Sequence, residues 1–182
     1  MESYNTIIVA GTGQNVGKTS LVCNIILQNN DKNIYAIKIS PHFHKLNKTD
    51  KIIVKTNNYT LIEETNTDTG KDSAKMLKVG AKKVFYIQCT DNYLPEVFNE
   101  IKKLIPEKSN IIIESGGARN IFTPKLFLMI KHADINKVKP KSVKLLNLAD
   151  KIITFKNNSH NFDISQITIK NNIWSILKPH SL

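Results

Sequence analysis

A glycine-rich segment near the start of the chain carries the residue types that bind phosphate. It reads Gly11-Thr12-Gly13-Gln14-Asn15-Val16-Gly17-Lys18-Thr19, and it joins a short apolar run to an amphipathic stretch. Glycines leave room for successive backbone N–H groups to wrap phosphate oxygens, and the dipole of a following helix favours the anion. Lys18 is expected to reach the β- and γ-phosphates, and Thr19 to place its hydroxyl on Mg²⁺. The segment, together with Ser20, therefore predicts a nucleoside-triphosphate site.

The spacing within this segment is longer than the usual G-x-x-x-x-G-K-[ST] pattern. Thr12 stands at the first position of that pattern, and the glycine comes one residue earlier, at Gly11. With this spacing the segment resembles the G-T-x-x-x-V-G-K-T loop of dethiobiotin synthetase and the cobyrinic acid amide synthases. The resemblance implies a P-loop protein that couples nucleotide chemistry to small-molecule biosynthesis. A chance glycine-rich turn is the alternative interpretation.

A P-loop also needs a carboxylate at the end of a neighbouring strand, where it organises Mg²⁺ and water. Glu114 fits this role, because it ends the apolar run that begins at Asn110 and is followed by Ser115-Gly116-Gly117. The stretch resembles the E-G motif of the molybdopterin-guanine dinucleotide biosynthesis protein B family and the E-G-x-G-G motif of dethiobiotin synthetase. Ser115 departs from both, because a glycine is expected there. An ordinary strand-ending glutamate is the alternative.

A second stretch resembles the same molybdopterin family. Thr67-Asp68-Thr69-Gly70-Lys71-Asp72-Ser73, followed by Lys78-Val79-Gly80-Ala81, is similar to its D-x-x-G-K-D-[ST] and K-A-G-A motifs. Lys38, His42 and His44 are similar to its K-H-x-H-H region, with fewer histidines. These matches follow the order of the family's motifs and cover about residues 4 to 120.

The resemblance implies a GTP-binding protein that hydrolyses slowly and assists attachment of a nucleotide to the molybdenum pterin. It implies that Asp68 or Asp72 approaches Mg²⁺, and that Lys38 and Lys71 face phosphate or pterin phosphate near the two histidines. Asp72 with Ser73 would also make a good helix N-cap, so capping and catalysis are both open for Asp72.

The guanine signature N-K-x-D or T-K-x-D is missing from the sequence. Asn136-Lys137-Val138-Lys139 has a lysine where the aspartate that reads the guanine amino group should stand. The choice between ATP and GTP is therefore left open.

Arg119 and the histidine pair are weaker candidates. Arg119 is the only arginine and lies shortly after Glu114. An arginine near a triphosphate can stabilise charge in the transition state, so Arg119 is a candidate catalytic residue, with a surface position as the alternative. His42 and His44 are two apart on an extended segment and point the same way, but no cysteine or third histidine follows at ligand spacing. That pattern argues against zinc.

Composition narrows the class of protein. The chain has 182 residues, 41% of them hydrophobic, and lacks an apolar run long enough to span a bilayer. We therefore expect a single domain over residues 1–182, a cytoplasmic location and no membrane partner. The net charge of +11 comes almost entirely from dispersed lysines, which argues against specific nucleic-acid binding. Homodimerisation and a protein partner are left open.

Alternating apolar and amphipathic stretches predict an α/β fold with a mainly parallel sheet flanked by helices. Residues 51–63 alternate around Thr56-Asn57-Asn58 and predict a small β-hairpin insertion. The pattern predicts other strands at 7–10, 34–39, 84–88, 110–114, 126–130, 151–155, 164–169 and 173–177, and helices at 17–28, 72–81, 94–104 and 142–149.

Three functions fit these features. The first is Mg²⁺-dependent binding and slow hydrolysis of GTP or ATP in molybdenum cofactor biosynthesis, with a pterin or other cofactor precursor as second ligand. The second is an ATP-dependent synthetase resembling dethiobiotin synthetase. The third is an adaptor that binds nucleotide without hydrolysing it and docks on a partner.

Overall fold

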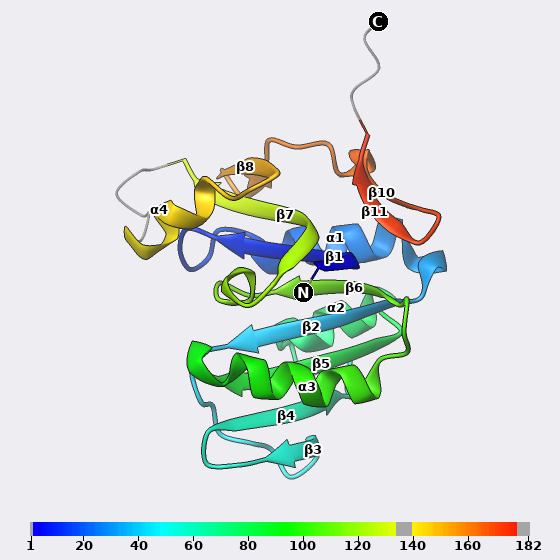
Figure 1. Cartoon of the computed structure of the whole chain (residues 1–182), viewed down its shortest axis with the longest axis vertical. Helices are drawn as coiled ribbons and strands as arrows, with labels where there is room; N and C mark the ends of the chain where they lie inside the picture. The colour runs from blue at the N-terminus through cyan, green and yellow to red at the C-terminus, as the bar shows by residue number, and fades with distance from the viewer. Residues whose placement is uncertain (1, 134–139, 178–182) are drawn as a thin grey trace, which may run out of the picture.

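The computed structural model describes residues 2–133 and 140–177, which form a sheet covered by helices on both faces (Figure 1). The sheet has nine strands in the order β3-β4-β5-β2-β6-β1-β7-β8-β9. Their bounds are β1 Glu2–Gly11, β2 Ile34–Ser40, β3 Lys51–Lys55, β4 Tyr59–Glu64, β5 Lys83–Cys89, β6 Asn110–Glu114, β7 Thr123–His132, β8 Lys151–Lys156 and β9 Ser159–His160. The predicted α/β class is confirmed.

The centre of the sheet is parallel and its two edges are antiparallel. Strands β5, β2, β6, β1, β7 and β8 run in the same direction, whereas β4 with β3, and β9, pair antiparallel at opposite edges. The predicted hairpin is confirmed as β3 and β4, and it extends the sheet beyond β5. Because parallel strands end at the same edge, residues that follow β1, β2 and β6 are brought together.

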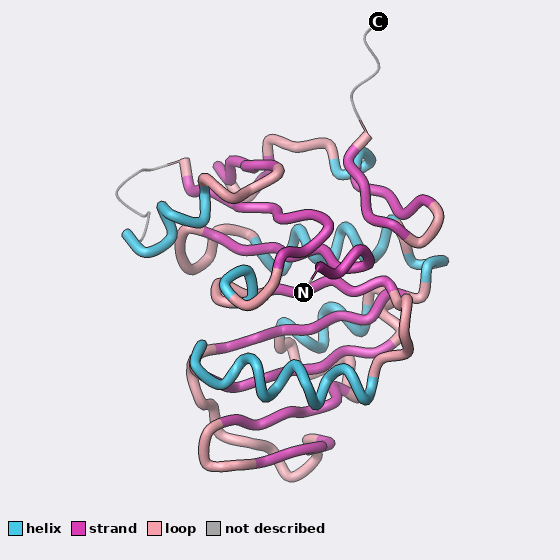
Figure 2. The backbone as a smooth tube through the Cα atoms, in the orientation of Figure 1, coloured by secondary structure: helices cyan, strands magenta, loops and turns pink. Residues whose placement is uncertain are grey.

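The sheet divides the core into two layers, and helices cover both of its faces (Figure 2). α1 (Lys18–Gln28) and α2 (Asp72–Lys78) cover one face, together with a separate two-stranded sheet of β10 (Ile167–Lys170) and β11 (Ile173–Ile176). α3 (Leu94–Leu104) and α4 (Pro140–Leu146) pack on the other face. Short 3-10 turns are η1 (Asn30–Lys32), η2 (Asp91–Tyr93), η3 (Ala118–Asn120) and η5 (Ile164–Gln166).

Central strands are buried on both faces, as their uninterrupted apolar runs predict. Ile7, Ile8 and Val9 of β1 have no exposed surface, and they alternate between the two core layers. Trp174 of β11 is also fully buried, and its Nε1 donates to the Asn5 carbonyl of β1 at 3.1 Å. The β10–β11 hairpin therefore ties the end of the described chain to the start of β1.

Several predicted elements have different bounds in the structure: β1, β7 and α4 begin earlier than predicted, and two further differences have a local cause. α2 ends at Lys78 rather than residue 81, because Gly80 has a φ of +106° and the chain turns toward β5. Residues 164–166 form a 3-10 turn rather than the start of a strand. There the Asp163 carboxylate accepts from the Ser165 N–H at 2.9 Å, and this local bond competes with sheet pairing.

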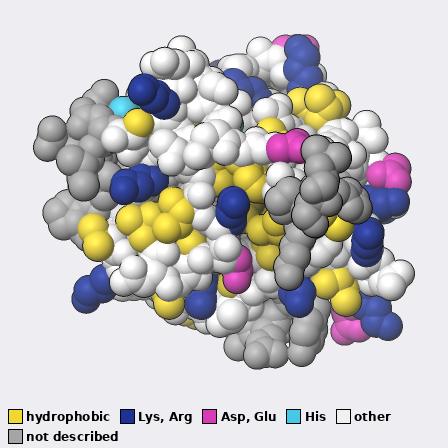
Figure 3. Space-filling view, turned by 90° about the horizontal axis from the view of Figure 1, so that it is seen from above, with side chains coloured by type: hydrophobic (Ala, Val, Ile, Leu, Met, Phe, Trp, Pro, Cys, Tyr) yellow, Lys and Arg dark blue, Asp and Glu magenta, His cyan; other side chains and the backbone are white. Residues whose placement is uncertain are grey.

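Two surface observations bear on partners. No helix within residues 2–133 and 140–177 has the length and apolar character needed to cross a membrane. On the face seen in Figure 3, the lysine side chains are scattered and do not gather into one continuous basic patch.

Candidate functional site

A cavity of about 730 Å³ opens at the edge of the sheet where β1, β2 and β6 end. Its floor is the segment Gly11–Thr19, called here the phosphate loop, and its walls come from β2, α2, α4 and the turn after β6. The volume lies in the range of small-molecule and cofactor sites. Of the predicted nucleotide-binding residues, every one except Thr12 lines this cavity.

The phosphate loop is held open by its glycines. Gly17 has a φ of +75° and is the N-cap of α1, so the helix begins directly after it. A side chain on Gly11 would come within 2.6 Å of Val16 Cγ2. The absence of a side chain at Gly11 therefore allows the two ends of the loop to approach closely. The Lys18 Nζ crosses the loop and donates to the Gly13 carbonyl at 2.7 Å. Backbone N–H groups at this helix start form a ready anion site.

Thr12 accounts for the unusual spacing of the loop. Its side chain is fully buried, and its Oγ1 accepts from the His132 N–H at 3.2 Å. Its own N–H donates to the Ile130 carbonyl at 2.9 Å. The extra residue is thus bound to β7, and it does not line the cavity, whereas Gly11 and Gly13 on either side of it do.

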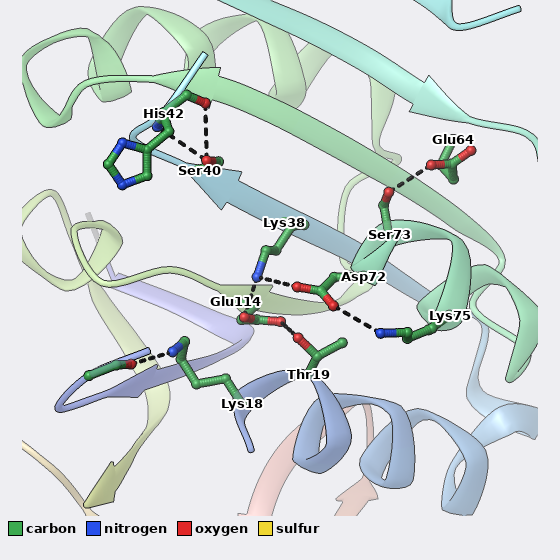
Figure 4. A network of polar contacts seen from close by, with 11 residues as sticks. Lys18, Thr19, Lys38, Ser40, His42, Glu64, Asp72, Ser73, Lys75 and Glu114 are labelled. Carbon is green, nitrogen blue, oxygen red and sulfur yellow. Dashed lines mark hydrogen bonds and ion pairs between the residues drawn. The ribbon is translucent and has the colours of Figure 1, made fainter. Parts of the chain in front are cut away.

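A group of charged residues, called here the charged wall, lies beside the loop and consists of Lys38, Asp72 and Glu114 (Figure 4). Lys38 on β2 is in register with Glu114 on the neighbouring strand β6, and the two side chains pair directly. Lys38 Nζ also contacts Asp72 Oδ2 at 3.1 Å, and Thr19 Oγ1 donates to Glu114 Oε2 at 2.8 Å. Three segments far apart in sequence therefore meet at the first turn of α1.

Contacts within the charged wall shift the pKa values of Lys38 and Asp72. Burial alone would lower the pKa of the Lys38 ammonium, but the Glu114 and Asp72 carboxylates outweigh burial and raise it. Burial would raise the pKa of Asp72, but the Lys38 ammonium dominates and holds it below its ordinary value. Lys38 is therefore charged and Asp72 is ionised at neutral pH, and each keeps the other in that state.

Asp72 is the first residue of α2, and the N-cap position belongs to Lys71 without a side-chain cap bond. Of the two roles open for Asp72, the structure thus favours the charged wall over capping. Ser73 points elsewhere, because its Oγ donates to the buried Glu64 carboxylate at 2.6 Å.

The other side of the loop is supported by two rings, Phe155 of β8 and His160 of β9, called here the ring support. Their centroids are 5.1 Å apart, and the His160 Nε2 lies 3.1 Å from the Gly17 carbonyl oxygen. A side chain on Gly17 would come within 2.6 Å of Phe155 Cε2 and 2.7 Å of the His160 Nε2. Burial lowers the pKa of His160 below its ordinary value, although the Gly17 carbonyl opposes this.

Several predicted site residues do not reach the cavity. Asp68 is exposed and pairs with Lys78 at 3.5 Å, and Lys71 pairs with Asp50 at 2.9 Å. His44 is exposed, and among the predicted histidines His42 alone lines the cavity.

Arg119 also lies away from the cavity. Its guanidinium lies over the Phe127 ring at 5.9 Å, and its Nη1 donates to Thr123 Oγ1 at 3.3 Å. The tetrapeptide 136–139, examined for guanine recognition, lies outside the described residues.

Ser115 replaces the expected glycine without blocking the site. Its side chain is buried, and its Oγ accepts from the N–H groups of Gly117 at 3.1 Å and Ala118 at 3.0 Å. The hydroxyl therefore shapes the turn after Glu114, and Ser115 lines the cavity together with Gly116 and Gly117.

The oxygen atoms of the charged wall suit magnesium. Mg²⁺ prefers hard oxygen ligands and commonly combines one or two carboxylates with substrate phosphates. Thr19, Glu114 and Asp72 present such oxygens at the cavity. Within the described residues no three His, Cys, Asp or Glu side chains cluster as a complete metal site. Any metal here would therefore need ligands from a bound phosphate as well.

Comparison with known proteins agrees with the fold. No protein-family model and no curated protein matches the chain. Among solved structures, the chain is similar to LpxK from Aquifex aeolicus, crystallised in complex with ATP, with 16% sequence identity and a TM-score of 0.54. The match covers 90% of this chain and 52% of LpxK, so this chain spans about half of that protein's length. At this identity the likeness shows the α/β fold and no more.

Proposed function

We propose that this protein binds a nucleoside triphosphate with Mg²⁺ and transfers or hydrolyses its terminal phosphoryl group. One observation carries the proposal: the Thr19 hydroxyl, at the start of α1, lies 2.8 Å from the Glu114 carboxylate, in the cavity that the phosphate loop lines. A hydroxyl and a carboxylate so placed beside a phosphate-binding loop are the parts from which P-loop proteins build a Mg²⁺ site.

The proposed roles follow from position. Backbone N–H groups of the phosphate loop would bind the β- and γ-phosphates, and Lys18 would exchange its bond with the Gly13 carbonyl for phosphate oxygens. Thr19, Glu114 and Asp72 would hold Mg²⁺, directly or through water. The metal would neutralise charge on the phosphates as the terminal group departs.

Lys38 has a second role in this proposal. In the nucleotide-free protein its ammonium forms ion pairs with two carboxylates, those of Asp72 and Glu114. With a divalent cation held by those carboxylates, Lys38 would be free to contact the terminal phosphate, where a positive charge stabilises the transition state.

A narrower hypothesis concerns the biological setting. Four residues that carry the molybdopterin-family resemblance line the cavity: Lys38, His42, Asp72 and Glu114. Their presence favours a small-molecule substrate, handled in the cytoplasm, over a nucleotide-dependent adaptor. The same Lys38 would serve a synthetase of the dethiobiotin type. The nucleotide base stays open between adenine and guanine.

Thermal unfolding with ATP or GTP, with and without Mg²⁺, tests the proposal. A ligand at about 100 times its Kd stabilises the folded state by about 2.7 kcal/mol, which corresponds to a rise in Tm of about 5 to 10 °C for a chain of this size. We expect such a shift with one nucleotide, only with Mg²⁺, and its loss in Lys18→Ala.

A matched control is Lys32→Ala, because Lys32 is exposed on η1, away from the cavity, and its side chain pairs with its neighbour Asp31 at 2.5 Å. Removing it should leave the nucleotide shift intact. Absence of any shift with both nucleotides at millimolar concentration would refute the proposed function.

A further inference from the structure

The cavity extends past the phosphate loop to a part with its own polar side chains. Asp91, directly after β5, and His42, after β2, line it, together with Asn120 of η3. β5 and β2 are neighbours in the sheet, so the loops that follow them emerge side by side above the end of β2. We call this part, formed by His42, Asp91 and Asn120, the outer compartment.

Asp91 differs from the other acidic residues of the cavity. Among the described lining residues three are acidic, and two of them, Asp72 and Glu114, pair with Lys38. The Asp91 carboxylate has no ion pair or hydrogen bond within residues 2–133 and 140–177. On a chain with a net charge of +11, a carboxylate left unpaired on a cavity wall is open to a ligand.

The turn after Glu114 is shaped around Asp91. A side chain on Gly117 would overlap the Asp91 carboxylate, so the glycine leaves the space that this group occupies. Ser115 fixes the turn by accepting two backbone N–H bonds. The carboxylate therefore reaches from the end of β5 across β2 to the loop of β6, on the same turn that carries the proposed Mg²⁺ ligand Glu114.

We propose that the outer compartment binds a small acceptor molecule with a hydroxyl group, and that Asp91 accepts the proton of that hydroxyl during phosphoryl transfer. This inference rests on the proposed function. In the step, the acceptor oxygen forms a bond to the γ-phosphorus, and the bond from that phosphorus to the β–γ bridging oxygen breaks. The bridging oxygen leaves with the electron pair on the nucleoside diphosphate, and the proton goes to Asp91. Products are a phosphomonoester and a nucleoside diphosphate.

The residues of the outer compartment determine which class of acceptor it can bind. An unpaired carboxylate disfavours an anion and favours an uncharged or cationic molecule, because opposite charges attract and like charges repel. A positioned carboxylate that takes the proton of the nucleophile contributes about 100- to 10,000-fold in rate. The residues also supply donors, since the Asn120 amide and the His42 ring can orient further hydroxyl groups.

The experiment compares three hydroxyl-bearing probes of different charge: glycerol, ethanolamine and glycerate. Each is added in large excess to the protein with Mg²⁺ and the nucleotide that gives the larger thermal shift. Phosphorus NMR then detects a phosphomonoester on the probe. We expect transfer to glycerol or ethanolamine at about ten times the rate of hydrolysis by water, and none to glycerate, because proximity favours a bound acceptor.

Two variants test whether phosphoryl transfer depends on Asp91. Asp91→Asn should lower phosphomonoester formation by about 100-fold or more while the thermal shift with nucleotide is retained. Gly117→Ala should have the same effect by displacing the carboxylate, and the double variant should be no worse than either single one. Asp31→Asn, an exposed aspartate on η1, is the matched control and should transfer like the wild type.

Some outcomes overturn the inference. No phosphomonoester with any probe, undiminished transfer in Asp91→Asn, or loss of nucleotide binding in that variant would each do so. These results leave the proposed function standing as long as the wild type shows its nucleotide shift. Loss of that shift is the separate failure that refutes the proposed function itself.

Discussion

On the β2 and β6 side of the phosphate loop the neighbouring groups are charged, whereas on the β8 and β9 side they are two packed rings. The charged wall joins Lys38, Asp72 and Glu114 through ion pairs, and Thr19 donates a hydrogen bond to it. The ring support touches the loop mainly at Gly17, through van der Waals contact and one polar contact from His160.

This difference indicates that the two sides of the loop have different roles. Charged groups can be rearranged when a cation or phosphate arrives, because their partners can be exchanged. Packed rings cannot, because a close-packed contact resists displacement. We therefore expect changes in the charged wall to act on turnover, and changes in the ring support to act on stability. Three predictions test that division.

The largest effect is expected from Lys38→Met. Removing the ammonium takes away the cation proposed to stabilise the transition state, which is typically worth about 100- to 1,000-fold in rate. We expect the rate of nucleotide hydrolysis, measured by phosphate release, to fall accordingly. Lys75→Met is the matched control, because Lys75 contacts the same Asp72 at 3.3 Å from the exposed side. It should change the rate by less than about fivefold. Equal losses in both variants would show that the wall acts only through its net charge.

A smaller effect, on stability, is expected from Gly17→Ala. The φ of +75° costs a residue with a side chain about 1 to 2 kcal/mol, and the new methyl would overlap Phe155 and His160. We expect Tm to fall by about 5 °C. The control is Gly116→Ala, where a side chain would meet nothing within 4 Å, and Tm should hardly change. If Gly17→Ala unfolds at the wild-type temperature, the rings do not support the loop.

The smallest effect is a pH dependence from His160. Its pKa in the folded protein is lowered by burial, so the unfolded chain binds more protons as pH falls through the ordinary value near 6.5. Its contribution to stability is therefore present above that pH and is lost as pH falls toward the folded-state pKa. His160→Gln keeps a donor for the Gly17 carbonyl but cannot titrate. We expect the wild type to lose more Tm between pH 7.5 and 5.5 than this variant, and the opposite order would contradict the assignment.

Most of the fold was predictable because it depends on local patterns. Apolar runs buried on both faces mark the central strands, and the hairpin at 51–63 has both alternation and a polar turn. α3 matches its predicted bounds, since Pro95 sets its start. β9 was missed because two residues carry no periodicity. The turn at 164–166 was missed because one side-chain hydrogen bond from Asp163 decided it.

The site was predictable only where a motif spans consecutive residues. The phosphate loop and Glu114 were found this way, but nothing in the sequence separates Asp68 from Asp72. The difference comes from Gly70, with a φ of +70°, after which α2 starts with Asp72 facing Lys38. The ring support could not be predicted either, because Phe155 reaches Gly17 only through the arrangement of the whole sheet.

The contact between His160 and Gly17 also bears on the order of assembly during synthesis. The two residues are 143 positions apart, and the Trp174 bond to Asn5 spans 169 positions. The phosphate loop leaves the ribosome before its ring support, because Gly17 precedes His160 by 143 positions. A nascent chain would therefore contain the complete loop sequence long before Phe155 and His160 are available to support the loop. Nucleotide capture by ribosome-bound chains of increasing length should begin only after β8 and β9 have emerged.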